Sequence, residues 1–126
     1  MIRLILGSTL AFLTVTGCGR NTGQTTDPAT NPIKGDPAKA KFSWIKANVY
    51  DGACIGCHNA AKPLGHVDLT SYEKSVEGKI VVTGKPDESS LYAQVASGKM
   101  PKGKGQLPDD QILAIADWIR NGAKND

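Results

Sequence analysis

The chain has 126 residues and a net charge of +3, with 40% hydrophobic, 21% charged and 6% aromatic residues. This length suits one domain rather than two, and the composition is that of a soluble globular protein. The weak charge, with no basic stripe between aromatic residues, argues against nucleic acid as a partner. Because aromatic residues are so few, we expect a small apolar core that needs another source of buried surface.

The N-terminal segment reads as an export signal. Arg3 precedes an apolar run, residues 4–15, that is shorter than the about 20 residues needed to span a membrane. The run ends in VTGC, which resembles the lipobox of bacterial lipoproteins. This resemblance implies a signal peptide of residues 1–17 and a lipid on Cys18, and an ordinary secretion signal cut nearby is the alternative. Because Arg3 leaves with the signal, 14 of the 15 basic residues stay with all 12 acidic ones, a net charge of +2.

A flexible tether is expected after the signal. Residues 19–40 are rich in Thr, Gly, Pro, Asn and Asp, and they have no apolar periodicity. A coil of these 22 residues spans about 25 Å on average. We therefore expect residues 18–40 to be the lipidated cysteine and its tether, and residues 41–126 to be the globular domain.

The domain is predicted to begin and end with an amphipathic helix. In AKFSWIKANVY, Phe42, Ile45 and Val49 fall on one face. In LPDDQILAIADWIRNG, Pro108 and the acidic residues after it suit the first turn of a helix. The apolar stripe of this last helix consists of Ile112, Ile115, Ala116 and Ile119.

Two shorter helices are predicted between them. In TSYEKSVEG, Thr70 and Glu73 have capping-box spacing, and in KPDESSLYAQVASG, Asp87 can cap the helix. The segment IVVT at 80–83 is a candidate strand. The predicted fold class is therefore all-α, with about four helices and long loops at 59–69 and 99–107.

The sequence CIGCH carries the chemistry. A zinc site needs about four ligands, and the adjacent Cys57 and His58 usually cannot both reach one ion. A thioredoxin-like pair needs a βαβ context, and a disulfide between Cys54 and Cys57 closes too short a loop to stabilise much. The remaining interpretation is covalent haem, in which both thiols add to vinyl groups and the next imidazole binds the iron. A haem would also supply the missing buried surface.

Both axial ligands of such a haem can be predicted. His58 would bind through Nε2 while its Nδ1–H donates to a backbone carbonyl, for which Pro63 is a candidate. The exported chain has one methionine, Met100, and Pro101 favours extended backbone there. Its thioether would be the distal ligand and would raise the reduction potential relative to a second histidine. His66 is the rival ligand, or else an exposed loop histidine.

These motifs resemble class I c-type cytochromes. The stretch CIGCHN after a first helix, and then SGKMPKG with LPDDQILAIADWIRNGA, are similar to small bacterial monohaem cytochromes over about residues 42–123. The resemblance implies a cytochrome c fold in which the first and last helices cross, with Tyr50 and Trp118 at the aromatic positions. Many members have a glycine where these helices touch, whereas the nearest small residue here is Ala47.

The resemblance implies outer-sphere electron transfer by one haem c rather than an enzyme activity. We expect a monomer, lipid-anchored in the cell envelope and facing the periplasm or outer surface, that serves redox partners of a respiratory or envelope chain. The alternatives are a haem-based peroxidase or gas sensor with a displaceable sixth ligand, or a cytochrome subunit of a larger oxidoreductase. Four lysines would either steer an acidic partner or be solvated loop residues: Lys62, Lys99, Lys102 and Lys104.

Overall fold

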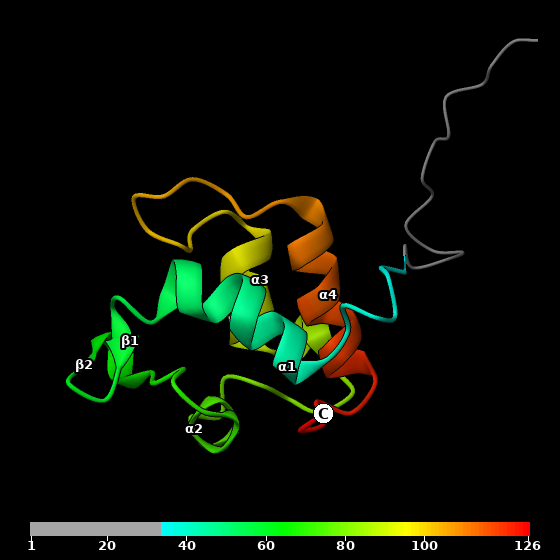
Figure 1. Ribbon diagram of the computed structural model, residues 1–126, viewed down its shortest axis with the longest axis horizontal. Coiled ribbons are helices and arrows are strands. Elements are labelled where there is room, and N and C mark those ends of the chain that lie inside the picture. The colour runs from blue at the N-terminus through cyan, green and yellow to red at the C-terminus, as the bar shows by residue number, and fades with distance from the viewer. Residues whose placement is uncertain (1–33) are drawn as a thin grey trace, which may run out of the picture. The chain divides into compact units, whose positions relative to one another are not determined.

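The computed structural model describes residues 34–126. The expected signal peptide, Cys18 and the tether up to residue 33 lie outside the described residues. Figure 1 shows a mostly helical arrangement, so the predicted all-α class is confirmed. In chain order the elements are α1 (Phe42–Ile45), η1 (Lys46–Cys54), β1 (His58–Asn59), β2 (Lys62–Pro63), η2 (Leu64–His66), α2 (Tyr72–Glu77), η3 (Pro86–Glu88), α3 (Ser90–Ala96) and α4 (Asp109–Arg120).

The first predicted helix is present, but its winding changes after Ile45. The α-helix α1 continues directly into η1, which is a π-helix. Its i→i+5 pattern ends with the N–H of Ile55 donating to the carbonyl of Tyr50 at 3.0 Å. π-Helical segments are rare in proteins, and those that occur are often found at functional sites. Phe42, Ile45 and Val49 are all buried, which confirms the predicted apolar face.

The two middle helices are present with different caps from those predicted. Ser71 is the N-cap of α2, because its Oγ accepts from the N–H of Lys74. Thr70 donates its hydroxyl to Asp68 instead, so the predicted capping box is wrong. Asp87 lies inside η3, and α3 begins after Ser89 without a side-chain cap.

The predicted strand at 80–83 is wrong. A buried serine, Ser89, fixes this segment in irregular backbone: its Oγ accepts from the N–H of Val82 and donates to the carbonyl of Lys85, both at 2.8 Å. The strands within residues 34–126 are instead β1 and β2, which pair antiparallel. The Ser89 hydroxyl thus bonds to backbone groups that would otherwise need a neighbouring strand as partner.

The core lies between the first helical segment and α4. The Phe42 ring centroid is 6.1 Å from that of Tyr50 and 5.9 Å from that of Trp118, so Phe42 bridges the two aromatic positions. Ala47 is exposed and is therefore not at the helix contact. The predicted stripe of α4 is confirmed, since four side chains are 8% exposed or less: Ile112, Ile115, Ala116 and Ile119.

Residues 35–39, which we call the N-terminal strap, lie against α4. The N–H of Gly35 donates to Oδ2 of Asp117 at 2.6 Å. The ammonium of Lys39 pairs with Asp110 at 2.9 Å. The packed chain therefore begins several residues before the expected boundary at residue 41.

Candidate functional site

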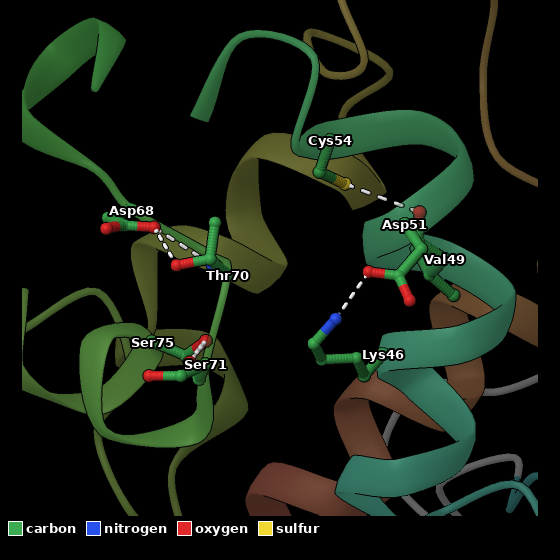
Figure 2. A network of polar contacts seen from close by, with 8 residues as sticks. All are labelled: Lys46, Val49, Asp51, Cys54, Asp68, Thr70, Ser71 and Ser75. Carbon is green, nitrogen blue, oxygen red and sulfur yellow. Dashed lines mark hydrogen bonds and ion pairs between the residues drawn. The ribbon is translucent and has the colours of Figure 1, made fainter. Parts of the chain in front are cut away.

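The helix that carries Cys54 is held by contacts between residues five apart. Lys46 Nζ lies 2.5 Å from Oδ1 of Asp51, and Cys54 Sγ lies 3.7 Å from the carbonyl oxygen of Val49 (Figure 2). In an α-helix, residues five apart lie about 140° apart around the axis. These two pairs therefore depend on the π winding of η1, which turns the Cys54 sulfur back along its own helix.

The two cysteines lie in different surroundings. Cys54 is partly buried and packs against the hydrophobic core, whereas Cys57 is exposed. Burial raises the pKa of the Cys54 thiol to about 11, and the Lys104 ammonium acts in the opposite direction. In the part of the chain that the structure describes, Cys54 and Cys57 form no disulfide with each other.

His58 stands at the start of the small antiparallel pair, opposite Pro63. The N–H of Leu64 donates to the carbonyl of Cys57 at 3.1 Å, and the N–H of Leu69 donates to that of His58 at 3.0 Å. These bonds fold the following loop back onto the cysteine segment. His58 Nδ1 is buried and forms no hydrogen bond with any of the described residues, so the predicted bond to the Pro63 carbonyl is not formed.

Met100 follows α3 and packs against the same hydrophobic core as Cys54. Its N–H donates to the carbonyl of Gln94 at 3.0 Å, which ties it to the end of α3. The Met100–Pro101 peptide bond is cis. The Cys54 thiol and the Met100 thioether, although distant in the sequence, thus border the same apolar cluster.

A side-chain contact joins the loop of Met100 to the cysteine helix. Lys104 Nζ donates to the carbonyl oxygen of Gly52 at 2.9 Å. Figure 1 shows the yellow-to-orange loop between α3 and α4 on the side of the molecule where η1 ends. The contact brings the segments of Met100 and Cys54 together.

His66 lies apart from these contacts. It is exposed at the end of η2, with φ of 60°. This position fits an exposed loop histidine better than an iron ligand. Within residues 34–126, no group of three or more His, Cys, Asp or Glu side chains is arranged to hold a metal ion.

The surroundings of the cysteines fit a large apolar group. Among the described residues, Leu64 in the loop after His58 is a large apolar side chain that is 48% exposed. Partly buried apolar side chains from the cysteine segment and both long loops border the core: Ala53, Ile55, Val67 and Met100. Two thiols at this spacing, an adjacent imidazole and a thioether are the donor set of a covalently attached haem.

Comparison with known proteins agrees with this donor set. A family model described as Planctomycete cytochrome C matches residues 54–103, which include both cysteines, His58 and Met100. The cytochrome c6 of Leptolyngbya boryana is 30% identical over 78 residues, which are 60% of this chain and 87% of that protein. No solved structure matches the chain significantly. The chain belongs to the c-type cytochromes.

Membership of this family confirms two of the predictions. The cofactor is covalently bound haem c, and the function is haem-based electron transfer. Proteins of this family are typically exported. In the part of the chain that the structure describes, no helix is long and apolar enough to cross a membrane.

Two features of the site were not predicted from the sequence. The π winding of η1 leaves the apolar spacing of its buried residues nearly unchanged, so periodicity does not reveal it. The bond from Lys104 to Gly52 joins residues far apart in the sequence. The sequence indicates that Lys104 lies in the loop of Met100, but it does not indicate which carbonyl accepts its ammonium.

Proposed function

We propose that this protein is an exported, lipid-anchored electron carrier with one haem c and His/Met ligation. When bound, the haem supplies a one-electron couple between ferrous and ferric iron. The observation that carries the proposal is the convergence of Cys54 and Met100 on one apolar cluster. The contact between Lys104 and Gly52 supports it, because it joins the two segments that would lie on either side of the ring.

Each residue of the site has a distinct role. Cys54 and Cys57 would form the two thioether bonds, and His58 would bind the iron through Nε2. Met100 would occupy the distal position, where its soft sulfur raises the potential relative to a second histidine. With both axial positions filled by protein, no open position is left for oxygen or peroxide, which favours electron transfer over the peroxidase and gas-sensor alternatives.

The proposed location rests on the N-terminal sequence. A signal peptide of residues 1–17 and a lipid on Cys18 would hold the protein at a membrane of the cell envelope, facing the periplasm or the outer surface. The contacts of the N-terminal strap favour a tether of residues 18–34 and a folded domain from residue 35. The domain would act as a monomer that reaches redox partners of an envelope electron-transfer chain.

The optical spectrum of the exported domain tests the ligation. The domain is produced in a host that attaches haem, and its spectrum is recorded in both oxidation states. We expect haem that survives acid–acetone extraction and a weak near-infrared band from sulfur–iron bonding in the ferric protein. Met100→Ala should abolish the band without releasing the haem. A band that survives this substitution would exclude Met100 as the ligand.

Single cysteine substitutions test the attachment. In Cys54→Ala and in Cys57→Ala one thioether should be lost, which shifts the absorption bands of the reduced pyridine adduct to longer wavelength. If both variants keep the haem and their bands stay at the wild-type wavelengths, the assignment of Cys54 and Cys57 as the attachment residues is contradicted. Rapid carbon monoxide binding to the reduced wild-type protein would favour the gas-sensor or peroxidase alternative.

A further inference from the structure

The loop that carries Met100 has few anchors of its own. Between Met100 and the buried Leu107, residues 102–106 are all exposed. Gly103 and Gly105 have φ of 78° and 81°, and the N–H of Lys104 donates to the carbonyl of Pro101 only at 3.4 Å. A segment with exposed backbone and little buried surface opens at low free-energy cost. Something outside the loop must therefore hold it in one place.

The carbonyl of Gly52 provides that anchor. The last carbonyls of a helix have no partner within the helix, and a cation near a helix C-terminus is favourable. Near the end of η1, Ile55 N–H donates to the Tyr50 carbonyl and Cys57 N–H to the Cys54 carbonyl, while Gly52 accepts from Lys104. The Lys104 ammonium, which comes from a loop distant in the sequence, thus satisfies a backbone carbonyl near the end of the cysteine helix.

We propose that Lys104 is a positioning residue that fastens the Met100 loop to the cysteine helix and so keeps the Met100 sulfur on the iron. The proposal rests on the Met100 ligation proposed above. It is specific to Lys104, since in the described part of the chain the side chains of Lys99 and Lys102 make no hydrogen bond or ion pair. Those two lysines carry the same charge in the same loop and are therefore matched controls.

Competition with free imidazole measures how firmly Met100 is held. Imidazole binds the ferric iron only after the sulfur has left, so its apparent affinity rises with the fraction of protein in which Met100 is detached. Loss of one charge-assisted hydrogen bond at an exposed position should increase that fraction about fivefold. Lys104→Ala should therefore bind imidazole about fivefold more tightly than the wild type. On warming, its near-infrared band should weaken at a lower temperature than the band of the wild type.

Three further variants make the test specific. Lys104→Arg keeps a donor and a charge, and it should restore most of the wild-type imidazole affinity. Lys99→Ala and Lys102→Ala should stay within twofold of the wild type. Equal effects of all three alanine substitutions would overturn the proposal, because net charge alone would then explain them. An unchanged affinity in Lys104→Ala would overturn it too.

The same measurements separate this proposal from the one on which it rests. A wild-type protein without the near-infrared band would refute the Met100 ligation and the role of Lys104 together. A wild-type protein with the band, in which Lys104→Ala leaves both band and imidazole affinity unchanged, would refute only the role of Lys104. Far-ultraviolet circular dichroism of each variant checks that the helices are retained.

Discussion

The backbone N–H of Gly35 lies 2.6 Å from Oδ2 of Asp117, although 82 residues separate them. Asp117 is only 7% exposed, and its other carboxylate oxygen pairs with Arg120. A buried carboxylate with two donors forms strong, charge-assisted hydrogen bonds. This contact fixes the N-terminal strap to α4, so the folded domain extends beyond its predicted beginning.

The strap contact predicts that Gly35→Ala is destabilising. A Cβ at this position would lie 3.1 Å from the Cβ of Leu113 and 3.2 Å from Oδ2 of Asp117, so the strap or these side chains would have to shift by a few tenths of an ångström. We expect a loss of about 1–2 kcal/mol in the free energy of unfolding, measured by urea titration of the haem-loaded protein. The control is Gly78→Ala, where the nearest atom is 3.8 Å away. Equal losses in the two variants would show that the strap does not hold the domain.

A second prediction compares two tyrosine hydroxyls. The Tyr50 hydroxyl is buried, and no group of the described residues forms a hydrogen bond with it. The nearby Ser75 side chain lowers the pKa of this hydroxyl, against the larger effect of burial. The Tyr72 hydroxyl donates to the carbonyl of Ala123 at 2.9 Å. Because an unpaired buried hydroxyl is costly and a paired one stabilises, Tyr50→Phe should be neutral or stabilising by up to about 1 kcal/mol. Tyr72→Phe should cost about 1 kcal/mol.

The measurement is again the free energy of unfolding of the two variants side by side. If Tyr50→Phe loses more than Tyr72→Phe, the buried hydroxyl of Tyr50 has a partner, such as an ordered water, and the prediction is wrong.

The same hydroxyl predicts a dependence of stability on alkaline pH. Burial raises the pKa of Tyr50 far above its ordinary value of 10.0. Above about pH 10 the unfolded chain loses this proton while the folded protein keeps it, so the unfolded state binds fewer protons and stability falls as pH rises. The contribution is fully present below pH 10. Its loss amounts to about 1.4 kcal/mol per pH unit.

Tyr50→Phe isolates this effect, because all other titrating groups are shared with the wild type. The difference in unfolding free energy between the two proteins should be constant from pH 7 to about pH 9.5 and should then change in favour of the variant. Parallel curves up to about pH 11 would mean that Tyr50 ionises in the folded protein as readily as in the unfolded chain.

Local patterns sufficed for much of the fold and for the chemistry of the site. The spacing of Ile112, Ile115 and Ile119 predicts the buried face of α4 because a helix returns to the same side every 3.6 residues. The attachment motif is equally local, since Cys54, Cys57 and His58 are close in the chain. The comparison with known cytochromes therefore agrees with predictions that needed no long-range contact.

The structural features that the sequence did not predict are of two kinds. Some depend on contacts with residues distant in the sequence, and one depends on which of two neighbouring residues caps a helix. Nothing in the strap sequence indicates that Gly35 meets Asp117, and nothing near residue 82 indicates that Ser89 will occupy its N–H. Ser71 and Thr70 can both cap a helix. Asp68 engages the Thr70 hydroxyl, so Ser71 takes the cap.

The last prediction concerns His66, the other histidine after His58. Its side chain is exposed, and its backbone has φ of 60° beside Gly65 at 67°, so the chain turns sharply at this point within the loop after β2. His66→Ala should therefore leave the near-infrared band and the reduction potential of the haem-loaded protein unchanged. We expect the band intensity to stay within about a tenth of wild type, whereas Met100→Ala removes it. Retention of a low-spin spectrum in Met100→Ala, but not in the double variant with His66→Ala, would instead make His66 a ligand that can replace the sulfur.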